Sequence, residues 1–349
     1  MALSRREFIK GGLVAAGAAA AALGGFGLVR NLFAGGGAER ENGQTIDTPR
    51  GLTRYVDMER SGELGRREQA LWALFSPCRL CPRLCGANRA AGRAGACSSA
   101  ENFKVASFGP HHGEENPLRG TRGSGTIFFS NCNLLCVFCQ NWQINHRGDG
   151  ARTSHSELAN MLLDMQRRGC HNVSFITPTH LVPHLVKGLR IAIAGGLNVP
   201  LCYNTGGYES LEVIRLLGGV VDIYQPDFKF QDSRIAARFT NGAPDYVLHA
   251  SAAIKEMYRQ VGPLQVTDGL ASRGVVVRHL VLPENLAGTD IFVRWVVNEL
   301  GTDAHVHIMN QYWPAFRANE FPPLDRRITS AEFNQAMRWA NDAGLRNFH

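Results

Sequence analysis

Three closely spaced cysteines are the residues of this chain best suited to catalytic metal chemistry. Cys132, Cys136 and Cys139 have the spacing Cys-x3-Cys-x2-Cys and follow a short apolar run at residues 126–130. A four-iron, four-sulfur cube is normally held by four thiolates. Three cysteines in one loop leave one iron open, which distinguishes a catalytic metal site from a closed structural one. The alternatives are a zinc knuckle and a cube completed by a distant cysteine, either Cys170 or Cys202.

A second group of four cysteines precedes this loop. It reads Cys78-x2-Cys81-x3-Cys85-x11-Cys97. Disulfides mostly staple small secreted domains, whereas close Cys-x-x-Cys spacings in a long chain indicate metal ligation. Four thiolates form a closed set for structural zinc or for an auxiliary iron–sulfur cluster, and sulfur ligation does not discriminate between the two. We favour the cluster, because an electron relay would be useful beside a redox site.

The elements that position the first loop are predicted by alternating apolar runs and amphipathic stretches from residue 125 onward. Short Val/Ile-rich runs between helices are typical of parallel strands buried on both faces. Six units are fewer than the eight of a closed barrel, so we predict an α/β fold with a partial (β/α)6 TIM-like barrel. An open doubly wound sheet is the alternative. The strands are expected at residues 126–130, 172–177, 199–204, 221–225, 274–282 and 304–309. The helices are expected at residues 154–168, 182–194, 209–217, 246–260, 290–300 and 330–343.

The chain divides into four predicted segments. Residues 1–45 form a signal or anchor, residues 46–124 a cysteine-rich metal-binding segment, residues 125–325 the barrel and residues 326–349 a C-terminal helix. Cysteine, glycine, arginine and proline dominate residues 76–124 without clear periodicity. That composition favours a small domain organised by metal rather than by an apolar core.

The N-terminus carries a targeting pattern. Residues 4–10 read Ser-Arg-Arg-Glu-Phe-Ile-Lys, and residues 11–29 contain no charge. A paired arginine before a weakly apolar, Gly-rich stretch is typical of a twin-arginine signal. The stretch would be either a cleaved signal or a retained anchor, since its length just suffices to span a bilayer. We expect an exported or membrane-anchored protein; a cytoplasmic location is the alternative.

Composition argues against a nucleic-acid partner. The net charge is +7, with 44% hydrophobic and 19% charged residues. No run of basic residues alternates with aromatic residues, a pattern that would indicate a nucleic-acid-binding surface. The positive charge is therefore interpreted as a solvated basic surface.

The first loop also carries a family resemblance. Residues 125–142, Gly-Thr-Ile-Phe-Phe-Ser-Asn-Cys-Asn-Leu-Leu-Cys-Val-Phe-Cys-Gln-Asn-Trp, resemble the radical S-adenosylmethionine (radical SAM) superfamily. More closely they resemble its PflX-like branch, which is similar to pyruvate formate-lyase activating enzymes. The likeness continues through residues 227–229, 256–262 and 278–283, and covers roughly residues 76 to 325.

The resemblance implies a reaction and its cofactors. The open iron would bind S-adenosylmethionine, and an electron from a low-potential donor would cleave it reductively to a 5′-deoxyadenosyl radical that abstracts hydrogen from a substrate. That substrate would be a protein glycine, as for the activating enzymes, or a small molecule; no catalytic side chain is assigned. The cofactor-binding residues implied are Asn204, Asp227, Lys229, Arg278 and His279. Carboxylate–hydroxyl and cation–carboxylate pairs suit that cofactor, although a structural Asp–Lys ion pair and a simple Asn-Gly turn are alternatives.

One motif departs from the activating enzymes. Those proteins carry Gly-Gly-Glu after the second strand to bind the amino group of the cofactor, whereas this chain has Thr177-Pro178-Thr179-His180. Threonine hydroxyls or backbone carbonyls would have to replace it. His180 and His184 have helical spacing, but Pro183 interrupts the turn and no acidic third ligand is evident, which argues against zinc.

Two other functional classes compete with the radical SAM enzyme. The first is an exported iron–sulfur electron-transfer protein that never cleaves S-adenosylmethionine, for which a fourth protein ligand would be expected at the Cys132 loop. The second is a zinc-stabilised interaction module, which anaerobic metal analysis would exclude.

The targeting pattern leads to a prediction about export. Replacing Arg5 and Arg6 with Lys should hold the protein in the cytoplasm, because the paired arginines are read as an address. Fractionation of cells expressing the wild-type and variant chains measures this. Identical distribution of the two chains would show that the pattern does not direct export.

Overall fold

A sheet of parallel strands forms the centre of the protein in the computed structural model, which describes residues 53–349. The predicted signal, Arg5 and Arg6 included, lies outside the described residues. Within residues 53–349, six parallel strands occur side by side in chain order. They are β2 (Ser124–Phe129), β4 (Val173–Ile176), β5 (Leu201–Thr205), β6 (Ile223–Pro226), β8 (Leu270–Leu280) and β9 (His305–Met309).

The order of these strands settles the fold class. A doubly wound sheet reverses direction at a switch point, so its strand order differs from its chain order. Here each crossover moves one strand further in the same direction, from β2 to β9. The predicted partial (β/α)6 barrel is therefore confirmed, and the doubly wound alternative is wrong.

Four further strands extend the sheet. The long strand β1 (Phe103–His111) runs antiparallel to β2, and β3 (Ala151–Thr153) runs antiparallel to β1. A hairpin joins β7 (Gln265–Thr267) to β8, and β10 (Asn347–Phe348) pairs in parallel with β9. None of these four was among the predicted strands.

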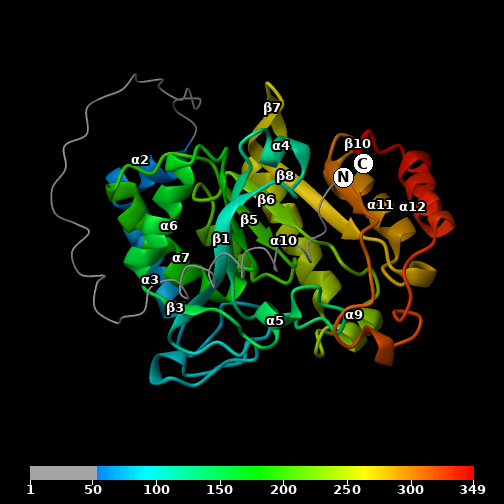
Figure 1. Cartoon of the computed structure of the whole chain (residues 1–349), viewed down its shortest axis with the longest axis horizontal. Helices are drawn as coiled ribbons and strands as arrows, with labels where there is room; N and C mark the ends of the chain where they lie inside the picture. The colour runs from blue at the N-terminus through cyan, green and yellow to red at the C-terminus, as the bar shows by residue number, and fades with distance from the viewer. Residues whose placement is uncertain (1–52) are drawn as a thin grey trace, which may run out of the picture. The chain divides into compact units, whose positions relative to one another are not determined.

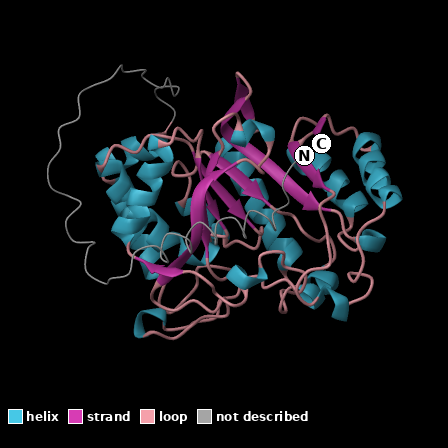
Figure 2. Ribbon diagram, viewed as in Figure 1, coloured by secondary structure: helices cyan, strands magenta, loops and turns pink. Residues whose placement is uncertain are grey.

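Helices cover the outer face of the sheet (Figure 2). Figure 1 shows α2, α3, α6 and α7 gathered at one end of the sheet, with α11 and α12 at the other. The longer helices are α2 (Arg54–Arg60), α3 (Glu63–Ala73), α6 (His155–Arg167), α7 (Val182–Ala194), α8 (Leu211–Leu216), α9 (Ser233–Phe239), α10 (Tyr246–Val261), α11 (Thr289–Leu300) and α12 (Ser330–Asp342). The short ones are α4 (Asn116–Arg119), α5 (Trp142–Asn145), η1 (Arg89–Ala91), η2 (Thr179–Leu181), η3 (Pro283–Asn285) and η4 (Ala318–Glu320).

Local sequence explains why α6 forms where it does. Ser154 accepts a hydrogen bond from the Glu157 backbone N–H, and the Glu157 side chain reaches back to the Ser154 N–H. This reciprocal capping box satisfies two of the N–H groups that a helix start leaves without partners. Leu158, Leu162 and Met165 then lie one helical turn apart and are fully buried. The apolar stripe therefore faces the sheet and α7.

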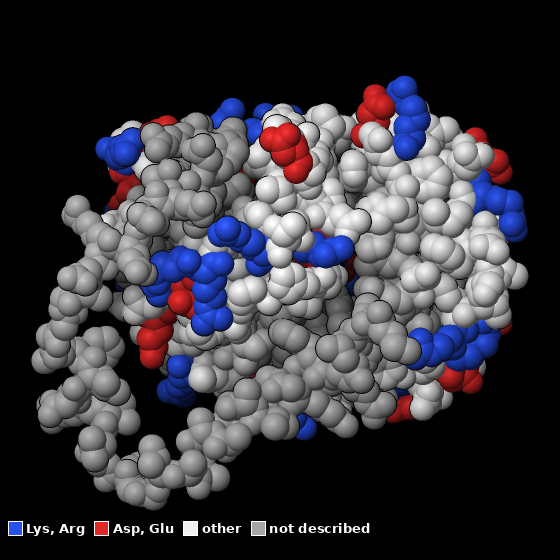
Figure 3. Space-filling view, turned by 45° about the horizontal axis from the view of Figure 1, so that its top comes forward, with Lys and Arg blue, Asp and Glu red and all other residues white. Residues whose placement is uncertain are grey.

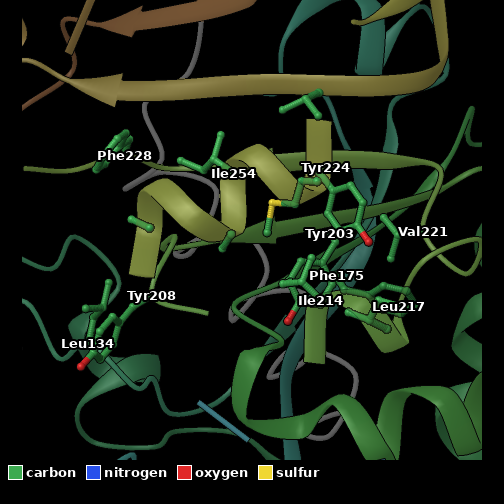
Figure 4. Packing of buried hydrophobic residues seen from close by; sticks show 14 of the residues in the cluster. Leu134, Phe175, Tyr203, Tyr208, Ile214, Leu217, Val221, Tyr224, Phe228 and Ile254 are labelled. Carbon is green, nitrogen blue, oxygen red and sulfur yellow. The ribbon is translucent and has the colours of Figure 1, made fainter. Parts of the chain in front are cut away.

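The core between the sheet and the helices is built from outward-pointing strand residues. Phe175, Tyr203 and Tyr224 come from three neighbouring strands and are fully buried (Figure 4). The Tyr224 hydroxyl donates to Gln260 Oε1 at 2.8 Å, so the helix layer satisfies the polar end of a core residue. Successive strand residues point to opposite faces, so the intervening residues face the barrel interior.

The segment before the barrel packs against this same core. The Tyr55 hydroxyl on α2 donates to the Val199 carbonyl at 2.8 Å and accepts from the Val199 N–H at 3.0 Å. Arg190 on α7 binds Glu59 at 2.8 Å and Glu68 at 2.7 Å. Residues 53–75 are thus attached to the helices of the barrel through both a buried hydroxyl and an ion-pair network.

Two surface properties bear on partners. On the face in Figure 3, lysine and arginine side chains occur in several separate places, with acidic side chains near many of them. Across residues 53–349, the helices include none that is long and apolar enough to cross a membrane.

Packing of α6 against α7 yields a stability prediction. Leu162→Ala should lower the free energy of unfolding by about 2–5 kcal/mol, because it removes buried methyl groups and leaves a cavity. Leu248 on α10 is 68% exposed, so Leu248→Ala should change it by about 0.5 kcal/mol or less. Denaturant unfolding of both variants measures the difference. Equal midpoints would show that the face of α6 contributes no more than a surface leucine.

Candidate cluster and cofactor site

The Cys132 loop begins where β2 ends and is folded back on itself by backbone hydrogen bonds. The Asn131 N–H donates to the Ile144 carbonyl of α5 at 3.0 Å. Asn131 and Leu135 have positive φ angles of 75° and 52°, a conformation that asparagine tolerates better than leucine does. The Asn133 side chain donates to the Tyr208 carbonyl at 2.7 Å. The loop is therefore held to the barrel at both its start and its middle.

The three thiols of this loop lie in one enclosed environment. Cys136 is buried, and Cys132 and Cys139 are half-buried. Removal from bulk water raises the pKa of each thiol, that of Cys139 to about 11, and the neighbouring loop thiols raise the pKa values of Cys136 and Cys139 further. The Lys229 ammonium acts on all three in the opposite direction. Metal-free, the loop holds neutral thiols; a bound metal would convert them to thiolates.

Hydrogen-bond donors point at the loop sulfurs. The Leu134 N–H donates to Cys132 Sγ at 3.4 Å, and Asn145 Nδ2 donates to Cys139 Sγ at 3.3 Å. Such bonds stabilise thiolate ligands, and they are among the factors that set the potential of an iron–sulfur cluster. The three thiols act electrostatically on one another, and as a donor set of three cysteines with N–H donors they suit a four-iron cube with one open iron.

Arg83, which sequence reasoning missed, clamps the loop from the cysteine-rich segment. Its Nε donates to the Asn133 carbonyl at 2.9 Å, Nη2 to the Thr240 carbonyl at 2.9 Å, and Nη1 to the Asn241 and Gly242 carbonyls at 2.7 and 2.8 Å. One guanidinium thus joins the loop to the turn after α9. In Figure 1, α5, which follows the Cys132 loop, and α9 both lie in the lower part of the view. Arg83 follows Cys81 by two positions, and that proximity is the only signal the sequence offered.

Four of the five predicted cofactor-binding residues meet at the carboxyl ends of β5, β6 and β8. Arg278 Nε donates to Asp227 Oδ1 at 2.7 Å and Nη2 to Asn204 Oδ1 at 2.7 Å. Lys229 Nζ donates to Asp227 Oδ2 at 2.5 Å. Burial raises the pKa of Asp227, but the charges of Arg278 and Lys229 outweigh it and hold that pKa below the ordinary value. A side chain at Gly206 would meet both Leu134 of the Cys132 loop and Lys229 Cε, at 2.7 and 3.6 Å, so the network adjoins the loop.

His279 lies elsewhere, which corrects the expectation that it joins this group. Adjacent residues on a strand point to opposite faces, and Arg278 already takes the interior face. His279 Nδ1 donates to the Phe228 carbonyl at 2.7 Å, Nε2 lies 3.0 Å from Thr289 Oγ1, and the ring stacks on Phe292 at 4.2 Å. Burial lowers its pKa to about 4. It is a neutral packing residue between β8 and α11.

The segment that replaces Gly-Gly-Glu has an unusual backbone. Thr177 has a φ of 59° and donates its N–H to the Asn204 carbonyl at 2.9 Å. Positive φ at a β-branched residue is a genuine outlier and costs about 1–3 kcal/mol. Glycine adopts this conformation freely, so Thr177 holds a strained backbone conformation at a position where glycine would be unstrained.

A buried acid near this segment was also missed. Glu209 is fully buried, accepts from Thr179 Oγ1 at 2.5 Å and from the Tyr203 hydroxyl at 3.3 Å, and bonds Thr205 as well. Burial raises its pKa to about 7. Tyr203 and Thr205 alternate with the inward-facing Asn204, so Glu209 lies on the helix side of the sheet. It does not replace the glutamate of Gly-Gly-Glu.

The two histidines considered for zinc have other partners. His180 Nε2 donates to the Ser130 carbonyl at 2.9 Å, and His184 Nδ1 lies 3.1 Å from His155 Nε2 with the two rings stacked. Neither is joined by an acidic ligand in these contacts.

The second cysteine group forms a compact loop. The Cys78 N–H donates to the Ala87 carbonyl at 3.0 Å, and a side chain at Gly95 would meet Cys85 Sγ at 3.1 Å and Cys97 Sγ at 3.8 Å. Backbone N–H groups of Leu80, Arg83 and Ala87 donate to the sulfurs of Cys78, Cys81 and Cys85 respectively. Among the His, Cys, Asp and Glu side chains of residues 53–349, no group of three is arranged so that it could hold a metal ion.

The remaining cysteines lie apart from both groups in the fold. Cys202 points into the barrel and donates to Gln225 Oε1 at 3.7 Å. Cys170 follows α6, where the charges of Arg168 and Asp164 act on it. Neither position gives support to a cube completed by a distant cysteine.

The barrel interior holds a polar cluster that sequence reasoning did not identify. Gln225 Nε2 donates to Glu114 at 3.0 Å and also to Glu115. Glu115 Oε1 lies 2.7 Å from His307 Nδ1, although the two residues are 192 positions apart. Arg278 Nη1 lies 3.9 Å from Glu114. Arg278 thus connects the Asp227 network to this deeper cluster.

Comparisons with known proteins agree with this geometry. A family model described as the radical SAM superfamily matches residues 126–271, which include the Cys132 loop. An uncharacterised protein of Methanocaldococcus jannaschii, MJ0674, is 33% identical over 282 residues, covering 78% of this chain and 76% of the relative. The chain belongs to the radical SAM superfamily. Radical SAM proteins are in general enzymes that use S-adenosylmethionine and a four-iron, four-sulfur cluster.

Solved structures that match are more distant. A domain of a pyruvate-formate lyase-activating enzyme from Bacteroides vulgatus is 11% identical, with a TM-score of 0.32, and the match covers 44% of this chain and 83% of that domain. Methylornithine synthase is 13% identical with a TM-score of 0.40, over 64% of this chain and 70% of that chain. These scores are low, so membership rests on the family model and on the Methanocaldococcus relative.

The Asp227 network leads to a prediction about stability. Asp227→Asn should lower the free energy of unfolding by about 3–5 kcal/mol, because Arg278 and Lys229 would stay buried without their shared carboxylate. Asp57 pairs with Arg60 on the exposed surface of α2, so Asp57→Asn should leave stability nearly unchanged. Thermal unfolding of the two variants at neutral pH measures this. The loss should also follow pH: because the folded-state pKa of Asp227 is depressed, its contribution is present above the unfolded-state pKa and disappears as pH falls through the folded-state value.

Proposed function

We propose that this radical SAM protein cleaves S-adenosylmethionine reductively at a cluster held by Cys132, Cys136 and Cys139, and that the radical formed abstracts hydrogen from a substrate. When bound, the cluster and cofactor supply one chemistry: one electron enters the sulfonium, the bond from sulfur to C5′ breaks, and methionine and a 5′-deoxyadenosyl radical result. The observation that carries the proposal is the placement of three close thiols beside the Asp227 network at the carboxyl ends of the strands.

The network offers groups that match the polar parts of the cofactor. The Asp227 carboxylate suits a ribose hydroxyl, and the Arg278 and Lys229 cations suit a carboxylate. In the structure these three satisfy one another, so binding would exchange internal hydrogen bonds for bonds to the cofactor. Asn204, already bound to Arg278, adds an amide that both donates and accepts.

Thr177 takes the part of the missing Gly-Gly-Glu motif. Its backbone keeps the positive φ that glycine would provide, and this directs its carbonyl and hydroxyl differently from those of a regular strand end. Both are acceptors suited to an ammonium group. Strain of this kind persists where the surrounding structure enforces it, and it clusters at ligand-binding positions.

For the substrate and the electron donor we propose chemical classes and no individual compounds. The PflX-like resemblance supports an activating-enzyme-like activity, in which a protein glycine gives up hydrogen, and a small molecule is the alternative substrate. The cluster of Glu114, Glu115, Gln225 and His307 lies deeper in the barrel next to Arg278. These residues are therefore the polar groups best placed to contact a substrate beside the cofactor. A low-potential one-electron donor completes the reaction.

The second cysteine group is proposed to hold its own metal. Three of its sulfurs receive backbone N–H groups two positions along the chain, which is how short loops support thiolate ligands. An iron–sulfur cluster is favoured over zinc because it could pass electrons toward the Cys132 loop. The twin-arginine pattern leads us to propose further that the protein is exported or membrane-anchored after its metal centres are loaded.

The proposed reaction is tested by product analysis. Anaerobically reconstituted protein given a strong reductant should convert S-adenosylmethionine to methionine and 5′-deoxyadenosine, measured by chromatography. Cys139→Ala should abolish the products, because the cube loses one of its three ligands. Cys170 lies after α6, away from the loop, so Cys170→Ala should retain them.

Two outcomes would contradict the proposal. One is an intact four-iron cluster at the loop that yields no 5′-deoxyadenosine with any reductant. The other is spectroscopy that shows a fourth cysteine on that cluster, which would favour the electron-transfer protein.

A further inference from the structure

Arg89 is a fully buried cation beside the second cysteine group. It begins η1, and its side chain has no exposed surface. Nη1 donates to the His180 carbonyl at 2.7 Å and lies 4.0 Å from Cys78 Sγ, Nε donates to the Ala100 carbonyl at 3.2 Å, and the guanidinium covers the Phe75 ring at 4.2 Å. Nη2 is buried and finds no hydrogen-bond partner among residues 53–349.

The partners of Arg89 leave its charge uncompensated. A guanidinium stays protonated in proteins, and a buried charge is costly unless an opposite charge lies beside it. The ion pairs formed among residues 53–349 include none with Arg89. The groups near it that can become anionic are the thiols of Cys78 and Cys85, on both of which its charge acts.

We propose that Arg89 is the buried counter-cation of an anionic metal–thiolate centre on Cys78, Cys81, Cys85 and Cys97. This rests on the proposed second metal centre. Four thiolates around a zinc ion, or around an oxidised four-iron cube, carry a net charge of about −2. A centre of that charge compensates the guanidinium and offers sulfur as an acceptor for the N–H groups of Nη2. Metal-free, the same segment leaves the cation beside thiols instead of a dianionic centre. Burial raises the pKa of Cys78 and Cys81, whereas at Cys85 backbone N–H groups and Arg89 outweigh burial and lower the pKa.

Arg89 also connects the second cysteine group to the Cys132 loop. Its Nη1 holds the His180 carbonyl, and His180 Nε2 holds the carbonyl of Ser130, two residues before Cys132. Burial lowers the pKa of His180 to about 3, so the ring is neutral and keeps its Nε2 proton on Ser130. Two hydrogen bonds, through His180, therefore connect Arg89 beside the second cysteine group to the backbone that leads into the Cys132 loop.

The test uses the full chain with Cys132, Cys136 and Cys139 all replaced by Ala, so that only the second centre can bind metal. Into this background we introduce Arg89→Met, which removes the charge at similar volume, and Arg89→Lys, which keeps it. Arg93→Gln, at an exposed arginine of the same segment, is the matched control. Each chain is loaded anaerobically with ferrous iron and sulfide, or with Zn²⁺, and metal content, chelator competition and the thermal midpoint are measured. The reduction potential is measured for the iron form.

A counter-cation predicts effects of opposite sign in the two metal states. Arg89→Met should weaken metal retention by about tenfold or more and lower the thermal midpoint of the loaded chain, yet raise that of the metal-free chain, where it removes an uncompensated charge. If iron is bound, the potential should fall, because a cation stabilises the more negative reduced state. Arg89→Lys should restore part of each effect, and Arg93→Gln should match the background.

The failures are distinguishable. A folded background chain that binds neither iron nor zinc would refute the second metal centre itself. A background that binds metal, with retention and potential unchanged by Arg89→Met, would refute the role of Arg89 and leave the centre standing. Loss of stability in both metal states, with no rescue by Arg89→Lys, would assign Arg89 a purely packing role and also overturn the inference.

Discussion

Arg278 is the residue on which the interior of this barrel depends. It stands on β8, the fifth of the six parallel strands in the described part of the chain, and its guanidinium reaches Asp227 on one side and Asn204 on another. Its backbone carbonyl accepts from the Phe228 N–H at 2.8 Å, so it also carries the pairing of β6 and β8 past the end of β6. A charge this deeply buried must be compensated. Two carboxylates from separate parts of the chain lie next to the Arg278 guanidinium: Asp227 at 2.7 Å and Glu114 at 3.9 Å.

Strand register places further polar residues on the same face of the sheet as Arg278. Arg278 pairs in register with His307 on β9, and Asn204 pairs with Gln225 on β6, so these four face the same side. Glu114 and Glu115 then enter from the segment after β1, and Glu115 reaches His307. The segment before the barrel is therefore needed to balance the interior charges. Glu114 and Glu115 therefore contribute to the barrel interior, although the composition of residues 76–124 favoured a small domain organised by metal.

The sequence predicted best what depends on local periodicity and spacing. Each of the six barrel strands and helices lies within a few residues of its expected position, and the Cys132 loop follows β2 as expected. Arg83, Arg89 and Glu115 could not be found in this way, because their partners lie 50 to 192 positions distant and no local pattern encodes such pairings. His279 is a different case. The alternation of side chains along a strand already implied that Arg278 and His279 point to opposite faces of the sheet, so the two could not join one group.

The cysteine-rich segment contributes more than possible metal ligands, because two of its arginines hold the Cys132 loop in place. Arg83 lies two residues after Cys81, and Arg89 lies four residues after Cys85. The backbone turns that gather the sulfurs therefore also direct these two guanidiniums. Arg83 holds the Asn133 carbonyl inside the Cys132 loop, and Arg89 reaches the carbonyl of Ser130 through His180. The loop is thus held at its entrance and its middle by residues whose positions depend on the second cysteine group. Since small metal-organised segments take much of their folding free energy from the ion, a metal bound by that group would order the segment first. The ordered segment would then fix the positions of Arg83 and Arg89, and through them the geometry of the Cys132 loop.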